Sequence, residues 1–239
     1  MALPMSNTPV YTLKIPSTGK QVKFRPFLVK DEKALLIAQQ SEKLEVMIDT
    51  LKGVIKSCIM DEEINVDEFA TFDLEYVFTQ IRAKSVGEKI ELLFKCDTCE
   101  DEKAVTKVSI DLTSLEVVKT PDHTNKIPLF DKVGMTMKYP TAALIDQLSE
   151  AGLDTDINKM FDIVAQCIDT IYDDDEVFYG KDHTRAELLD FLNNLTSDQF
   201  AKIQNFFSTM PKLSKPVSYS CPVCGKKHDK VLEGLASFF

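Results

Sequence analysis

The sequence has few of the motifs by which enzymes are recognised. It contains no glycine-rich phosphate-binding loop, no Gly-x-Ser-x-Gly turn that would present a nucleophilic serine, and no His-Glu-x-x-His zinc-protease motif. Its three histidines are scattered along the chain and form no recognisable catalytic or metal-binding set. Because nothing in the sequence indicates catalysis, we expect a non-enzymatic protein without a small-molecule substrate.

Long apolar runs are also absent. No stretch approaches the roughly 18 consecutive apolar residues that indicate a transmembrane helix. Residues 1–9 lack the basic start and the apolar core of a secretory signal. The six cysteines, four of them in Cys-x-x-Cys pairs, fit metal binding in a reducing compartment better than a disulfide framework. We therefore expect a cytosolic protein without a membrane partner.

Positive charge is in deficit. The chain has 28 lysines and arginines against 38 aspartates and glutamates, which gives a formal net charge of −10 at pH 7. An acidic surface repels phosphate backbones, and no dense run of basic residues compensates for it. We therefore expect no nucleic-acid partner.

The sequence does contain two Cys-x-x-Cys pairs, Cys96-Asp-Thr-Cys99 and Cys221-Pro-Val-Cys224. β-rich sequence enters each pair, as in zinc knuckles, which are tight turns that each present two thiolates to one metal ion. Zn²⁺ in structural sites prefers four ligands in a closed tetrahedron, and thiolates are common among them. We predict that Cys96, Cys99, Cys221 and Cys224 bind one structural Zn²⁺.

Two other readings of these pairs stay open, a redox dithiol and a metal-free remnant. A redox pair normally lies at a helix N-terminus, where the helix dipole lowers a thiol pKa. Here a charged turn and a further β segment follow each pair, at 105–112 and 230–232. This context favours zinc. His228 could replace a failed cysteine ligand, but with four thiolates present we expect its side chain to be exposed to solvent.

The other two cysteines have a different context. Cys58 and Cys167 lie on apolar faces of predicted helices, beside Ile59 and Ile168. Free cysteines in such positions are usually buried and behave as small apolar side chains. We expect both to be buried free thiols.

Alternating and periodic patterns predict a mixed α+β protein. In the first half, alternation at 10–15 and 20–25 around turn-forming residues predicts a hairpin. Apolar residues at helical spacing then predict helices at 31–38, 42–59 and 72–84. Strands on both sides of the first Cys-x-x-Cys pair complete this half.

The same order recurs in the second half, so we infer a diverged internal duplication. The halves are residues 1–119 and 120–239, each a β-hairpin plus helices plus a Cys-x-x-Cys β-knuckle. We expect them to form one compact unit joined by a zinc-ribbon-like module. The elements predicted for the second half are a hairpin at 126–130 and 132–139, helices at about 141–151 and 156–172, a helix around 188–195 and one carrying residues 200–207.

Aromatic side chains suggest where a partner could bind. Phe69, Phe72 or Phe206 could form part of a docking patch, with packing in the protein's own core as the alternative. The terminal pair Phe238–Phe239 has the same two alternatives, and for it docking into the core is the more common outcome.

Three longer strings carry a family resemblance: Leu13-x-Ile-Pro-Ser-Thr-Gly19, Val22-Lys-Phe-Arg-Pro-Phe-Leu-Val29, and residues 72–88 leading into the first knuckle. Together with the opening Leu3-Pro, they resemble the baseplate hub assembly proteins of T-even-type contractile-tailed bacteriophages. The resemblance covers essentially the whole chain. It does not supply the zinc prediction, which depends on the cysteines of this sequence.

The resemblance implies a non-enzymatic role in assembling the central hub of the phage tail baseplate, as an assembly chaperone or as a hub subunit. The implied partners are phage baseplate hub and tail proteins. The implied location is the host cytoplasm during assembly, with the virion tail baseplate as the further possibility. Two rival functions remain: a zinc-ribbon regulator that contacts the transcription machinery or nucleic acid, and a Cys-x-x-Cys oxidoreductase.

Overall fold

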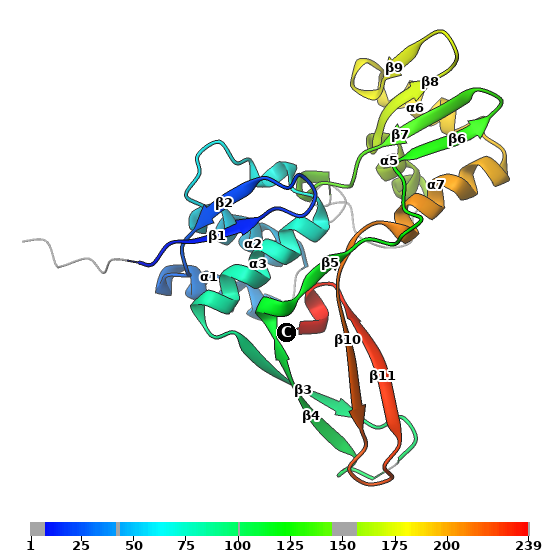
Figure 1. The fold of residues 1–239 in the computed structure, drawn as a ribbon. Coiled ribbons are helices and arrows are strands. Elements are labelled where there is room, and N and C mark those ends of the chain that lie inside the picture. The colour runs from blue at the N-terminus through cyan, green and yellow to red at the C-terminus, as the bar shows by residue number, and fades with distance from the viewer. Residues whose placement is uncertain (1–7, 42–43, 100, 145–156, 239) are drawn as a thin grey trace, which may run out of the picture. The chain divides into compact units, whose positions relative to one another are not determined.

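The computed structural model describes residues 8–41, 44–99, 101–144 and 157–238. Its first two strands form the hairpin predicted from the sequence (Figure 1). Strands β1 (Tyr11–Lys14) and β2 (Gln21–Phe24) pair antiparallel. Alternation along them buries Leu13, Val22 and Phe24 on one face. The tight turn between the strands ends at Gly19, whose φ of 70° is a left-handed conformation that favours glycine.

Three helices follow the hairpin, close to the predicted positions: α1 (Val29–Gln40), α2 (Leu44–Cys58) and α3 (Thr71–Ser85). Helix α3 is the most buried of them, since Phe72, Val77 and Ile81 are almost fully covered. Its N-terminus is capped by the buried Asp73 carboxylate, which accepts bonds from the backbone N–H groups of Ala70 (3.1 Å) and Ser17 (2.8 Å). The second of these bonds ties the hairpin turn to the helix.

The remaining strands of this part of the chain form two further sheets. Strands β3 (Lys89–Lys95) and β4 (Val105–Asp111) make an antiparallel pair. Strands β11 (Lys227–Glu233), β10 (Lys212–Ser220) and β5 (Glu116–Val118) make a three-stranded sheet in that order. Short 3-10 helices complete the part, at Val66–Glu68, Leu112–Ser114 and Leu235–Phe238. Phe238 is 1% exposed in the core between these sheets, so docking of this side chain into the protein's own core is confirmed.

Residues 119–211 contain a four-stranded antiparallel sheet in the order β6-β7-β8-β9. Its core joins the sheet to the helices through Met135, Ile168, Leu192, Ile203 and Phe206. The elements are β6 (Lys126–Phe130), β7 (Val133–Met137), α5 (Ile157–Gln166), β8 (Ile168–Tyr172), β9 (Val177–Tyr179), the 3-10 helix η3 (Gly180–Asp182), α6 (Arg185–Asn193) and α7 (Ser197–Thr209).

One predicted helix of this region is too long. The helix expected at 156–172 ends at Gln166, and residues 168–172 form strand β8. Apolar residues at both helical and alternating spacing made the two readings hard to separate from sequence. The tertiary structure decides between them, because β8 pairs with β7 on one side and β9 on the other. The helix predicted at about 141–151 lies largely outside the described residues.

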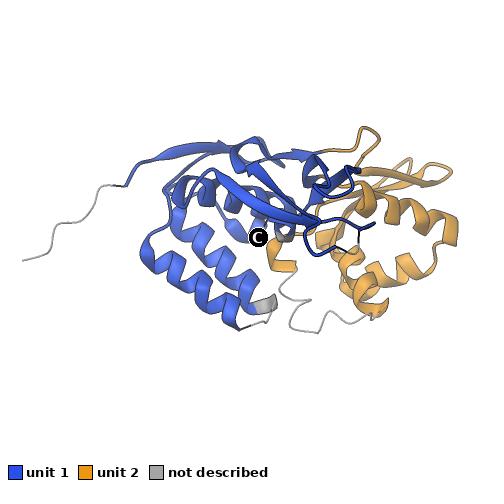
Figure 2. Ribbon diagram, turned by 90° about the horizontal axis from the view of Figure 1, so that it is seen from below, with its two compact units in different colours: residues 1–118, 212–239 blue, residues 119–211 orange. Residues whose placement is uncertain are grey.

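The contacts divide the chain into two compact units, residues 1–118 with 212–239 and residues 119–211 (Figure 2). Both Cys-x-x-Cys pairs therefore belong to the first unit, because the last strands return to it. The duplicated halves 1–119 and 120–239 stay a prediction. One detail is alike in both: Arg25 N–H donates to the Cys58 carbonyl (2.9 Å), and Lys138 N–H donates to the Cys167 carbonyl (2.8 Å), so each long helix ends against the second strand of a hairpin.

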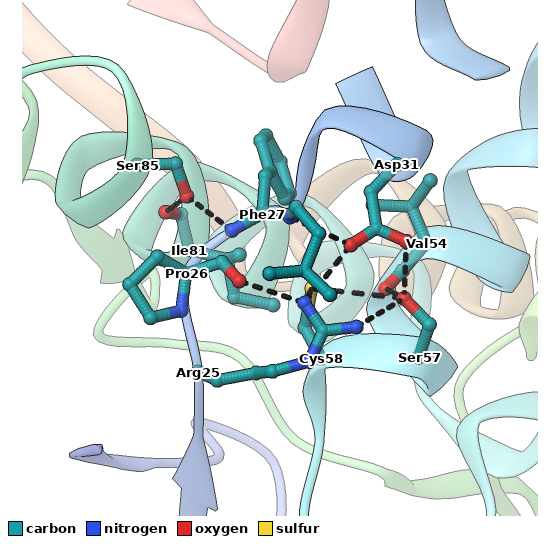
Figure 3. Close-up of polar contacts among 10 residues, drawn as sticks. Arg25, Pro26, Phe27, Asp31, Val54, Ser57, Cys58, Ile81 and Ser85 are labelled. Atoms are coloured by element: carbon teal, nitrogen blue, oxygen red, sulfur yellow. Dashed lines mark hydrogen bonds and ion pairs between the residues drawn. The ribbon is translucent and has the colours of Figure 1, made fainter. Parts of the chain in front are cut away.

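A polar network joins the end of β2 to α1 and α2 (Figure 3). The Asp31 carboxylate accepts bonds from the Arg25 guanidinium (2.9 Å), the Leu28 N–H (2.8 Å) and the Ser57 hydroxyl (2.9 Å). Burial by itself raises the pKa of Asp31, but these bonds to its charged form outweigh burial, so the net pKa is lowered. We call Arg25, Asp31 and Ser57 the Arg25 network.

Of the two alternatives for the aromatic side chains, packing in the protein's own core is confirmed. Phe69, Phe72 and Phe206 are 6%, 2% and 2% exposed and belong to the cores of their units. Among the described helices, none is both long enough and apolar enough to cross a bilayer.

Candidate metal centre

Two hairpins of the first unit bring the four predicted ligands together. Cys96 follows the last residue of β3, and its N–H donates to the Ala104 carbonyl (2.8 Å). Cys221 follows the last residue of β10, and its N–H donates to the Lys226 carbonyl (2.9 Å). These bonds close both turns, and Figure 1 shows both hairpins running to the same end of the unit.

The second turn has the backbone of a metal knuckle. Gly225 N–H donates to the Cys221 carbonyl (3.0 Å), and Gly225 has φ 73°, which a residue with a side chain adopts only with strain. Val223 N–H points at the Cys221 sulfur (3.4 Å). Backbone N–H groups aimed at a sulfur stabilise its negative charge, as a thiolate ligand requires.

The sulfur atoms are spaced for one metal ion. All four lie within 4.8 Å of one another, with Cys96 Sγ 4.0 Å from Cys224 Sγ and Cys99 Sγ 3.9 Å from Cys221 Sγ. A tetrahedral ion with metal–sulfur bonds of about 2.3 Å holds its sulfurs about 3.8 Å apart. Disulfide sulfurs would be about 2.0 Å apart, and all four cysteines are free thiols. The four cysteines could therefore hold a metal ion.

The thiols of this cluster differ in acidity. Bonds from the hydroxyl and the backbone of Thr98 lower the pKa of Cys96 to about 5. The neighbouring Cys224 sulfur and burial raise the pKa of Cys99 to about 12. The backbone N–H of Lys226 lowers the pKa of Cys224. The lowered pKa values favour the thiolate form of Cys96 and Cys224, whereas Cys99 would have to lose a proton when a metal ion binds.

The sequence led us to expect an exposed His228, and this prediction is wrong. The side chain is buried beside the cluster, at 7% exposure. It pairs with Tyr219 across β10 and β11 and stacks on its ring at 5.0 Å. Its Nε2 lies 3.3 Å from Cys96 Sγ, and its Nδ1 lies 3.5 Å from an Asp97 carboxylate oxygen. His228 is therefore placed to donate an N–H to the Cys96 sulfur and to orient it. Alternation in β11 was the sequence signal for this burial, since it places His228 on the opposite face from Lys227 and Asp229.

The other histidines and cysteines lie elsewhere. His123 and His183 belong to the second unit, and neither is among the residues of the cluster. His123 is buried between Thr209 and Tyr139, with 3.0 Å to each hydroxyl, and burial lowers its pKa. Cys58 and Cys167 are buried free thiols, as predicted, and burial raises the pKa of Cys167 to about 12.

Besides the sulfur cluster, side chains of the two hairpins meet near the tips: Phe94 stacks on Tyr219 at 4.9 Å, and Lys226 lies 3.5 Å from an Asp97 carboxylate oxygen. The small apolar cluster at the tips consists of Cys96, Ala104 and Cys221, with Cys99 packed against it. The Thr106 hydroxyl donates to the Ser220 carbonyl across the two hairpins (3.0 Å). A metal ion bound by four sulfurs would add a further link between the tips.

Comparisons with known proteins agree with the resemblance seen in the sequence. A family model described as T4 bacteriophage base plate protein matches residues 8–239. The curated baseplate hub assembly protein gp26 of Enterobacteria phage T4 is 24% identical over 230 residues, which cover 96% of this chain and 97% of that protein. No solved structure matches the chain.

Proposed function

This chain belongs to the T4 bacteriophage base plate protein family, and we propose that it is a non-enzymatic factor that binds hub proteins while the tail baseplate is assembled in the host cytoplasm. The match to a hub assembly protein along nearly the full length of both chains is the observation that carries this proposal. An acidic chain with a net charge of −10 suits binding to proteins better than binding to nucleic acid.

We further propose that Cys96, Cys99, Cys221 and Cys224 bind one Zn²⁺ with a structural role. Four sulfur ligands fill a tetrahedral site and leave no position for a substrate or a reactive water. The ion would connect the β3–β4 hairpin to the β10–β11 hairpin, whose cysteines are separated by more than a hundred residues of chain. Its role would be to hold the shape of the first unit, and partner binding would use other surfaces.

Metal analysis tests the zinc proposal. The purified chain should contain one zinc per molecule, and Cys221→Ser should lose it and lower the melting temperature, because binding and folding are coupled at such sites. Cys167→Ser is the matched control, since Cys167 is a buried free thiol of the other unit. It should keep the full zinc content. Full zinc content with unchanged melting in Cys221→Ser would contradict the proposal, and so would a metal-free protein whose cysteine pairs cycle through disulfides.

Assembly in infected cells tests the function itself. Affinity-tagged chain should co-purify with identified baseplate hub or tail proteins, and phage lacking the chain should produce incomplete baseplates that a plasmid copy repairs. Normal baseplates without the chain would refute the proposal. Mass spectrometry of purified particles then separates the two forms of the role, because a hub subunit stays in the virion and a chaperone does not.

A further inference from the structure

The sheet of the second unit ends in a strand with an unusual edge. Strand β9 is the last strand of the order β6-β7-β8-β9 and lies at the margin of the sheet in Figure 1. Its three residues are large and apolar, and all are exposed: Val177 at 54%, Phe178 at 37% and Tyr179 at 50%. Proteins usually protect an edge strand with charges, proline or a covering segment, because its free backbone groups attract other strands. β9 carries no charged residue and no proline, although it is short, at three residues.

The backbone of β9 offers hydrogen-bonding groups at this edge. Asp173 N–H donates to the Glu176 carbonyl (3.1 Å), which makes these two residues a hydrogen-bonded pair. Bonding alternates along antiparallel strands, so the next pair, Tyr172 and Val177, directs its backbone groups away from the partner strand. The N–H and C=O of Val177 and the N–H of Tyr179 therefore point outward.

A pocket of about 290 Å³ lies beside this edge. Ile171 and Phe178 are cross-strand partners and so present their side chains on the same face of the sheet. Together with Leu188 and Phe191 from α6 they form apolar walls of the pocket. A strand added to β9 would place every second side chain on this face, with one of them at the pocket.

The charges around the edge are predominantly negative. The loop before β9 carries four exposed carboxylates at residues 173–176, and Glu187 lines the pocket. Lys132 pairs with Asp174, and His183 lies 4.0 Å from Glu187. Among the described residues, no ion pair is found for Asp175 or Glu176. An occupant of this edge would be favoured by lysine or arginine side chains.

We propose that β9 and its pocket bind an extended segment of a partner protein, which adds a strand to the sheet. The segment would bond to the outward groups of Val177, insert one large apolar side chain into the pocket, and carry basic residues toward the 173–176 loop. The inference rests on the proposed function, because it specifies the surface and the chemistry by which a baseplate protein would be bound.

Binding of designed peptides to the full-length chain tests the proposal directly. The probe is the peptide Lys-Val-Lys-Trp-Lys-Val-Lys. Because the chain contains no tryptophan, all tryptophan emission comes from the peptide. Its emission should shift to the blue as the indole enters the pocket, whereas the same peptide with glutamates in place of the lysines should bind much more weakly.

Backbone bonding is tested on the peptide, so that the protein stays unchanged. N-methylation of alternate residues along one edge of the probe should abolish binding, and N-methylation of the other alternate set should be tolerated. On the protein side, Val177→Pro removes one outward N–H and should weaken binding about five- to tenfold. Val177→Thr keeps the N–H and strand propensity and should bind as the wild type does. Equal binding of both N-methylated peptides, or of both variants, would overturn the proposal.

The contribution of the loop carboxylates to peptide binding is tested against a matched control in the other unit. Reversal of two charges in Asp175→Lys with Glu176→Lys should weaken binding severalfold at low salt. The same change at two exposed loop residues, in Glu62→Lys with Glu63→Lys, should not. Equal weakening by both pairs would show general attraction between a basic peptide and an acidic protein, and would refute the specific site.

Complementation separates this inference from the proposed function. In phage lacking the chain, Val177→Thr should restore baseplate assembly and Val177→Pro should not. Full restoration by both would refute the β9 site and leave the assembly function standing. If baseplates form normally without any copy of the chain, the assembly function fails as well.

Discussion

Removal of the Asp31 carboxylate is expected to destabilise the first unit strongly. Asp31 is 5% exposed and accepts three hydrogen bonds, one of them from an Arg25 side chain that is itself only 14% exposed. Loss of one partner from a buried ion pair costs about 3–5 kcal/mol. Arg25 keeps its bond to the Pro26 carbonyl (2.8 Å) in Asp31→Ala. We therefore expect a loss of about 2–4 kcal/mol, below the full cost of an unpaired buried charge.

The measurement must report on the first unit alone, because two compact units can unfold separately. Amide hydrogen exchange of α1 in increasing urea gives the free energy of opening for the segment that Asp31 caps. Asp61→Ala is the control. Its carboxylate also accepts a backbone bond, from Lys23 N–H (2.6 Å), but at an exposed site. The control should cost no more than about 1 kcal/mol.

The pH dependence of Asp31→Ala follows from the lowered pKa of Asp31. The carboxylate contributes its stability above its unfolded pKa, near 3.8, and loses it as pH falls through the lower folded value. The gap between wild type and variant should therefore narrow in acid. A loss below about 1 kcal/mol at pH 7, or simple additivity with Arg25→Ala, would refute the coupling described for the Arg25 network.

Two further predictions concern the packing of the chain end on α3. Burial raises the pKa of Glu75, which accepts a bond from the Leu235 N–H. The folded state then binds a proton more readily than the unfolded state, so Glu75 costs stability as pH rises above its unfolded pKa, near 4.5. In Glu75→Gln, the free energy of unfolding measured in urea should no longer show this fall between pH 4 and 8. The same pH dependence in the variant and the wild type would contradict the prediction. Phe238→Ala should cost about 3–5 kcal/mol, because the ring is 1% exposed in the core. If Phe238→Ala unfolded with the same urea midpoint as the wild type, the ring would not stabilise the unit.

Local signals account for the parts of this protein that the sequence determined. The hairpin of β1 and β2 follows from strict alternation around turn-forming residues. Both features lie within one short segment, so no distant residue is needed to predict the hairpin. The Cys-x-x-Cys spacing likewise defines each half of the metal centre, since two cysteines and the turn between them are continuous in the chain. That both pairs meet was predicted from the preference of zinc for four ligands, and the sulfur distances agree with it.

Long-range contacts decided the rest. Residues 168–172 are a strand because β7 pairs with them on one side and β9 on the other. The spacing of apolar residues within the segment does not reveal these pairings. His228 is buried because β10 places Tyr219 beside it and the turn after β3 places Cys96 there. Asp31 is buried because Arg25 and Ser57 arrive from other elements. The free edge of β9 also depends on which strand is last in the sheet. Sequence patterns determine which residues can form an element or a ligand, whereas burial, pairing and exposure depend on which distant residues the fold brings beside them.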